Sequence, residues 1–488
     1  MSRLLATAIY GILIWIVYNS DRDRKSKTSN ALWIPIAWLL ISGSRPVAAW
    51  LYTGSSLSPD QLMEGSPIDA AVRLGLITAG IVVLTKRQKS FSKFVQENRP
   101  MLLFLFYCAV STVWSDYPDV AFKRWIRLLG DFIMILVVLT DPDRSGAVKR
   151  VLSSVAIILF PVSVMLNKYY PEFSRYYDLW TGRQLFSGVA LDKNMLGMTC
   201  LVYGIGMFWR LVTTYKEPKG KQRTRRLIAQ AIVIAMVFYL FKDADSMTSE
   251  SCFIMMSGLI AAMTFSKIAR KPIVVHLMVL TIVGITFSTL FLHIGGGFAF
   301  QKLGRNSNLT GRTEIWAGLL HFSGNPIFGT GFDSFWMGNR MKRIWAAGGQ
   351  LYGINEAHNG YLETYLNLGW IGVTLLAACI VTGYRNILTA LRLEPEIGRI
   401  RLGLFVAVVV YSFTEAGFRA NSSVWLAFLF SIAAVPSSLI VKPERPLAIR
   451  KLAGFEPRAG SRVGISPERQ TIPSGVGKTA TRVLRTAT

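Results

Sequence analysis

Long apolar stretches separated by short polar connections run along most of the chain. A helix of about twenty apolar residues crosses the hydrocarbon core of a bilayer. The pattern therefore predicts an all-α polytopic membrane protein of about twelve to thirteen spanning helices, with one large outer loop. The expected spans are residues 4–19, 31–53, 70–85, 100–114, 124–140, 150–167, 194–212, 227–242, 250–266, 272–294, 360–384, 401–417 and 423–440.

The composition agrees with this pattern, because 51% of the 488 residues are hydrophobic and the mean hydropathy is +0.38. We expect one membrane domain over residues 1–441 and a basic tail over 442–488 that is too polar to build a core. The apolar run from Leu4 to Tyr18 follows a single Arg3 and lacks a clear small-residue cleavage site. We interpret it as a retained helix and not as a cleaved signal peptide.

Charge predicts the orientation of the chain. Roughly 35 of the basic residues fall in one alternating set of connections and in the tail, which the positive-inside rule assigns to the cytoplasm. The connections predicted on the outer face are 54–69, 115–123, 168–193, 243–249, 295–359 and 415–422.

The net charge of +26 is scattered among loops, so we expect no nucleic-acid partner. The tail either attracts anionic lipid or keeps the protein soluble.

The cysteines predict neither disulfides nor a metal site. Cys108, Cys200, Cys252 and Cys379 all fall within or at the ends of apolar stretches, where cysteine usually serves as a small buried residue. The sequence holds no CxxC, HExxH or GxxxxGK pattern. We therefore expect no metal, no nucleotide and no other cofactor.

The loop at 295–359 is the one long polar excursion. Within it, Arg312 begins a stretch with helical apolar spacing, which predicts a short amphipathic helix. His358 stands where this loop enters the next membrane helix, ahead of Gly369 and Gly372. A helix N-terminus disfavours an imidazolium, so we expect a neutral His358 that is able to accept a proton. The alternative is that His358 only caps the helix or hydrogen-bonds a carbonyl.

Several arginines lie on the predicted outer face against the orientation rule, among them Arg124, Arg183, Arg305 and Arg312. A guanidinium suits a bidentate anion such as a diphosphate. Contact with lipid phosphate is an equally good interpretation of any single one. The remaining histidines, His276, His293 and His321, are weaker candidates, because two lie in an apolar stretch and one on the amphipathic helix.

These motifs together resemble a known family. The pattern His358-Asn359, nine residues, Gly369, two residues, Gly372 resembles the signature of the O-antigen ligase and polymerase superfamily of bacterial membrane glycosyltransferases. The stretches GRTEIW at 311–316, NPIFGTGFDSFW at 325–336, WSDYPDVAFKRW at 114–125 and GVALDKNMLG at 188–197 are similar as well. The resemblance covers about 100–440, with the ligase-related region at about 230–384.

The resemblance implies metal-independent sugar transfer at the periplasmic face of the bacterial inner membrane, from a glycan on undecaprenyl diphosphate. It implies that His358 activates the acceptor hydroxyl and that Arg312 binds the donor diphosphate, with Asn359, Glu314 and Arg305 in support. Membrane lipid, a flippase and chain-length or export proteins are the implied partners.

One departure affects the choice of branch. Ligases of the family commonly carry an arginine in the short outer loop that here is Asp245–Ser249, and this chain has none there. Arg183 or Arg124 would then supply the second cation. We expect a polymerase of exopolysaccharide or O-antigen type; transfer to lipid A–core by a ligase is the alternative. A lipid-linked sugar transporter fits less well, because no internal repeat is evident.

Overall fold

The computed structural model describes residues 2–23, 26–51, 66–177, 182–267, 271–291 and 311–434. The basic tail at 442–488, Arg305 and His293 lie outside these residues. The helices of the first half are α1 (Arg3–Asp21), η1 (Asn30–Leu32), α2 (Trp33–Ser42), α3 (Val47–Leu51), α5 (Pro67–Lys86), α6 (Gln88–Glu97), α7 (Arg99–Ser111), η2 (Thr112–Trp114), α8 (Pro118–Leu139), α9 (Arg144–Tyr169) and α10 (Pro171–Ser174). Those of the second half are α11 (Lys193–Tyr215), α12 (Lys221–Ala244), α13 (Met247–Phe265), α14 (Pro272–Phe291), α16 (Arg312–His321), α17 (Gly338–Ala346), η4 (Gly349–Leu351), α18 (Gly360–Leu393), α19 (Pro395–Tyr411) and α20 (Ser423–Ile432).

The protein is an all-α polytopic membrane protein, as the apolar pattern predicts. Eight helices in the described part of the chain are long and apolar enough to cross a bilayer, and each predicted span overlaps a helix. The strands of the described chain are β1 (Arg175–Tyr177) and β2 (Gln184–Phe186), which form an antiparallel hairpin with Arg175 opposite Phe186.

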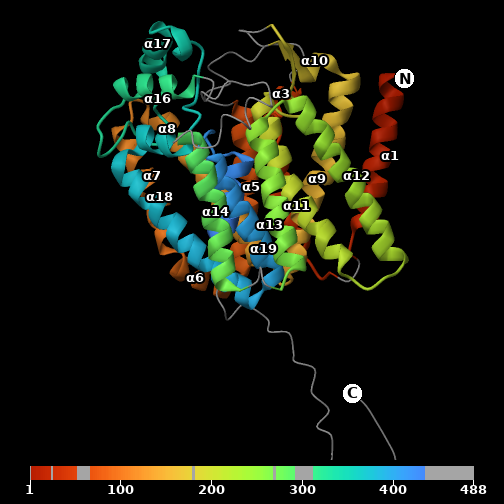
Figure 1. Ribbon diagram of the computed structural model, residues 1–488. Coiled ribbons are helices and arrows are strands. Elements are labelled where there is room, and N and C mark those ends of the chain that lie inside the picture. The colour runs from red at the N-terminus through yellow and green to blue at the C-terminus, as the bar shows by residue number, and fades with distance from the viewer. Residues whose placement is uncertain are drawn as a thin grey trace, which may run out of the picture. The chain divides into compact units, whose positions relative to one another are not determined.

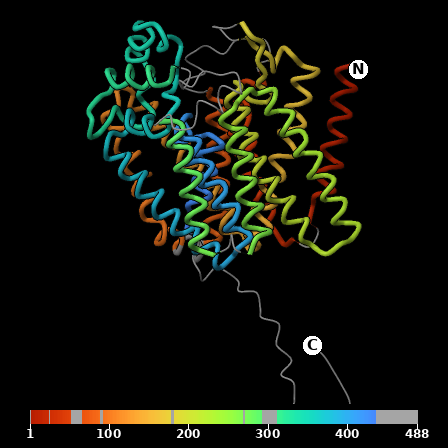
Figure 2. The backbone as a smooth tube through the Cα atoms, viewed as in Figure 1, coloured from red at the N-terminus to blue at the C-terminus, as the bar shows by residue number. Residues whose placement is uncertain are grey.

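The long helices lie side by side as a bundle, with α16 and α17 at one end (Figures 1 and 2). α19 is buried along almost its whole length, and 78% of the apolar window of α11 is buried. Only 6% of the equivalent window of α14 is buried, although α14 is the more hydrophobic of the two. A helix that is apolar all round and yet exposed fits contact with lipid chains.

The single span expected over 31–53 is wrong in one respect, because the chain breaks there into α2 and α3. Gly43 ends α2, and Pro46 stands just before α3. Proline has no backbone N–H and cannot continue the ladder of helical hydrogen bonds. Arg45, in the break, donates from its Nε to the carbonyl of Ala190 at 3.0 Å, so this short connection is fastened to the loop before α11.

All four cysteines are buried and free, which confirms their interpretation as packing residues.

Candidate functional site

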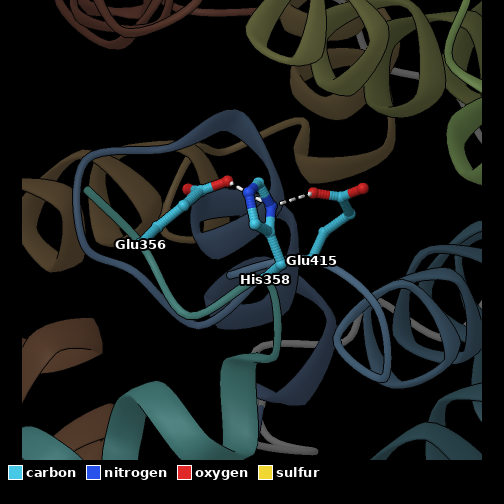
Figure 3. A group of neighbouring side chains, drawn as sticks. All are labelled: Glu356, His358 and Glu415. Carbon is cyan, nitrogen blue, oxygen red and sulfur yellow. Dashed lines mark hydrogen bonds and ion pairs between the residues drawn. The ribbon is translucent and has the colours of Figure 1, made fainter. Parts of the chain in front are cut away.

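His358 lies between two carboxylates at the end of the bundle that carries α16 and α17. Its Nδ1 is 2.9 Å from Oε1 of Glu356 and 3.3 Å from Oε2 of Glu415 (Figure 3). Glu356 comes from the same loop as His358, whereas Glu415 follows α19. These two carboxylates were missed from the sequence, because only the fold brings the connection after α19 against this loop.

Two guanidinium groups complete the group of side chains, which we call the His358 cluster: Arg312, Glu356, His358, Glu415 and Arg419. Nη2 of Arg312 is 2.7 Å from Oε1 of Glu415, and its Nη1 donates to the carbonyl of Thr414. Nη1 of Arg419 is 3.9 Å from Oε2 of Glu356. Each carboxylate therefore faces both the imidazole and an arginine.

The backbone at His358 is held in an unusual conformation. Its φ is +48°, in the left-handed region that non-glycine residues seldom occupy. On one side, Trp316 donates to the carbonyl of Ala357 at 2.8 Å. On the other, Asn359 caps α18 by accepting from the amides of Tyr361 and Leu362. Left-handed residues persist where their surroundings over-determine them, often at functional sites.

The first glycine of the pair after His358 determines how the loop segment at 325–331 packs against α18. Gly369 breaks α18 with φ +62°, and a Cβ there would lie 2.2 Å from the carbonyl oxygen of Ile327. The opened backbone accepts and donates hydrogen bonds: Trp370 N to Pro326 O is 2.9 Å, and Gly331 N to Asn367 O is 2.9 Å. The segment NPIFGTG is thus docked onto the helix break.

A second clamp joins the same segments through Glu363 in the first turn of α18. One carboxylate oxygen accepts from Trp336 Nε1 at 2.6 Å, and the other accepts from the amide of Ala357 at 2.9 Å. The residue before His358 is therefore tied to the helix that follows it.

A cavity of about 420 Å³ opens beside the cluster. Its lining includes Glu356, His358, Glu415 and Arg419, and also Asp192 and Asn194 from the stretch GVALDKNMLG. Asp192 caps α11 by accepting from the amide of Met195 at 2.9 Å. Three loops predicted to share the outer face thus meet at one cavity that holds both charged and amide side chains.

Electrostatics overturns one expectation for His358. Desolvation lowers its pKa, but hydrogen bonds and charge interactions with Glu356 and Glu415 outweigh this effect and raise the pKa to about 10. The prediction of a neutral imidazole is therefore wrong for this arrangement. The two carboxylates at hydrogen-bonding distance favour the imidazolium more strongly than burial disfavours it.

The arginine at 419 is a site residue that the loop pattern alone did not distinguish from its neighbours. Desolvation lowers its pKa, and the carboxylates of Asp333, Glu363 and Glu356 raise it by more. Arg419 lines the main cavity and a smaller neighbouring one that also includes Asp333. Among the described residues, Arg419 is the arginine that lines the His358 cavity.

The other predicted site residues lie in different places. Arg124, on α8, pairs with Asp333 at 3.5 Å and does not line the His358 cavity. Arg183 is largely exposed and lies 3.6 Å from Asp245, at the loop in which the ligases' arginine is missing. Glu314 is exposed on α16. The structure thus brings Arg312 to Glu415, which also contacts His358, but brings neither Arg124 nor Arg183 there.

Glu356, His358 and Glu415 also meet the distance requirement for a metal site, since their ligand atoms lie within 4.8 Å of one another. Two carboxylates and an imidazole are chemically suited to Zn²⁺. A divalent cation would, however, have to compete with Arg312 and Arg419 for the same carboxylates. We therefore assign no metal to the cluster, and metal independence remains a prediction.

Comparison with known proteins gives one informative relative. No family model matches the chain. The chain is 22% identical over 323 residues to the exopolysaccharide production protein ExoQ of Rhizobium meliloti (strain 1021), and the match covers 64% of this chain and 71% of that protein. This similarity supports the resemblance found in the sequence, that of a polysaccharide polymerase or O-antigen ligase-like membrane protein.

Proposed function

We propose that this protein is a membrane glycosyltransferase that polymerises oligosaccharide units carried on undecaprenyl diphosphate, at the periplasmic face of the inner membrane. At a general level, the similarity to ExoQ indicates a function in exopolysaccharide production. The observation that carries the finer proposal is the His358 cluster, in which each of the two carboxylates that hold the histidine also pairs with an arginine, beside a cavity that His358 and Arg419 line. This set suits proton removal from a hydroxyl beside a departing anion.

His358 is the proton acceptor in this proposal. Glu356 and Glu415 both contact Nδ1, so they fix a proton there and leave Nε2 for the acceptor hydroxyl. The same carboxylates make the imidazole a stronger base while reducing the fraction that is unprotonated at neutral pH. The rate is therefore expected to rise with pH as the neutral form appears.

Arg312 and Arg419 stabilise the negative charge that develops on the diphosphate as the glycosidic bond to it breaks. Nη2 of Arg312 contacts Oε1 of Glu415 at 2.7 Å. Donor binding thus requires Arg312 to exchange a carboxylate for a phosphate. Arg419 already stands at the cavity wall, and its longer 3.9 Å contact with Glu356 makes it the easier of the two to engage.

Asp192 and Asn194 are placed on the acceptor side in this proposal. They enter the cavity from the start of α11, away from the loop that carries His358. Carboxylate and amide groups hydrogen-bond sugar hydroxyls, whereas a second anion beside the diphosphate would be repelled. Replacement of Asn194 should therefore weaken acceptor use more than donor binding.

The test is an assay of purified protein in liposomes that contain a lipid-linked oligosaccharide and lipid A–core. We expect His358→Ala to abolish chain elongation, and Arg312→Lys to impair it because an ammonium cannot form a bidentate fork. His321→Ala and Arg343→Lys change the same residue types on α16 and α17 and should keep activity.

Full elongation by His358→Ala would refute the proton-acceptor role. Transfer of glycan to lipid A–core without elongation would instead identify a ligase, and movement across the bilayer alone a transporter.

A further inference from the structure

A second polar cavity, of about 460 Å³, is lined by residues where α1 ends and α9 begins, at the opposite end of the bundle from α16 and α17 (Figure 1). It is lined by the end of α1, the connection from α1 to α2, the first turns of α9 and one residue of α11. α1 packs against α9 and α12 at the side of the bundle (Figure 1). The cavity shares no lining residue with the His358 cavity, so the proposed transfer reaction leaves it unexplained.

Arg210 of α11 is the central feature of this cavity. Its side chain is only 3% exposed, and Nη2 lies 3.3 Å from the carbonyl and 3.7 Å from Oδ1 of Asp21. Its Nε and Nη1 are buried without a hydrogen-bond partner among the described residues. The carboxylate of Asp21 is itself shared, because Gln230 donates to it at 2.6 Å.

Unsatisfied donors on a buried guanidinium are costly, since the group has lost its hydration and gained too little in return. A cavity beside such a group provides room for the missing acceptor. An anionic oxygen is the acceptor that a guanidinium prefers.

The remaining charged side chains of the cavity lining give a positive excess. Arg22, Lys149 and Arg150 join Arg210, against the carboxylates of Asp21 and Asp23. Two of these cations are partly engaged: Lys149 pairs with Glu396 at 2.5 Å, and Arg150 donates to Thr28 at 3.1 Å. Arg22 is exposed and free to approach a ligand at the mouth of the cavity.

We propose that this cavity binds a phosphate group, with Arg210 at its base and Arg22 at its mouth. The hydroxyl of Ser154 also lines it and is able to donate to a phosphate oxygen. The phosphate has two possible sources, the headgroup of an anionic lipid at this end of the helices or a soluble phosphate ester. The site is independent of the reaction at His358.

The experiment uses the full chain purified in detergent and native mass spectrometry. The probes are dioctanoyl phosphatidylglycerol, dioctanoyl phosphatidylcholine and glycerol 3-phosphate. We expect the anionic lipid to bind more tightly than the zwitterionic one. Arg210→Gln should weaken that binding about ten- to a hundredfold, the usual effect of losing charged hydrogen bonds. Binding of glycerol 3-phosphate with the same sensitivity to Arg210→Gln would identify a soluble ester as the source.

Arg22→Glu serves as a second variant, because an exposed side chain can be changed even if the buried Arg210 is needed for folding. It should also weaken binding, through charge reversal at the mouth. Lys27→Glu is the matched control: Lys27 is exposed in the same connection but does not line the cavity. Equal losses in Arg22→Glu and Lys27→Glu would show general surface attraction and overturn the proposal. Unchanged binding in both Arg210→Gln and Arg22→Glu would overturn it as well.

Discussion

Removing the carboxylate of Glu356 should lower the pKa of His358 by a measurable amount. Glu356 is the nearer of its two partners, at 2.9 Å from Nδ1, and the side chains of both residues are mostly buried. A charge-assisted hydrogen bond contributes about 1.5–3 kcal/mol, and one pKa unit corresponds to about 1.36 kcal/mol. Glu356→Gln should therefore lower the pKa from about 10 by about one to two units.

The sign of the pH dependence follows from this shift. A raised pKa keeps His358 protonated at neutral pH. At pH values below the pKa, the neutral fraction increases about tenfold for each unit by which the pH rises. Elongation by the wild type should rise with pH until about 10. In Glu356→Gln the same rise should end at lower pH, because the neutral form then appears earlier. The ion pairs of protonated His358 stabilise the fold below the unfolded-state pKa, and this contribution is lost as pH rises through about 10.

Nuclear magnetic resonance of protein labelled at histidine measures the pKa without any substrate, and the chain has only four histidines to assign. The pH profile of elongation then shows whether the same group limits the rate. Glu314→Gln is the control, since Glu314 is exposed on the nearby α16 and makes the same chemical change. A wild-type His358 pKa at or below about 6.5 would refute the electrostatic argument. An unchanged pKa in Glu356→Gln would do the same.

Further predictions concern the supports of the site and its ions. Gly369→Ala should destabilise the protein by at least about 1 kcal/mol, because φ is +62° and a Cβ would lie 2.2 Å from a carbonyl oxygen; Gly258→Ala, which has open space in α13, should not lower the melting temperature. Trp336→Phe removes the donor to buried Glu363 and should cost about 1–3 kcal/mol in thermal or denaturant unfolding; retention of wild-type stability would mean that this clamp is not needed. Exhaustive treatment with EDTA should leave elongation unchanged, whereas loss of activity restored by Zn²⁺ would assign a metal to the His358 cluster.

The amino-acid sequence determined the class of fold because apolar length is a local property. A run such as that of α14 must be covered by lipid or protein wherever it lies, so its helix is predictable without knowledge of its neighbours. The same holds for the cysteines, whose apolar flanks were enough to predict burial. The helix beginning at Arg312 and the junction at His358 were also predicted from local spacing.

Only the tertiary structure decided the protonation state of His358. Glu415 is separated from it by the whole of α18 and α19, and no local pattern reports that distance in space. The break of α18 at Gly369 also depends on tertiary structure, because the segment around Ile327 that docks there lies about forty residues earlier in the chain. Helix spans follow from the chain's own hydrophobicity, whereas a pKa depends on which charges the fold brings within a few ångströms.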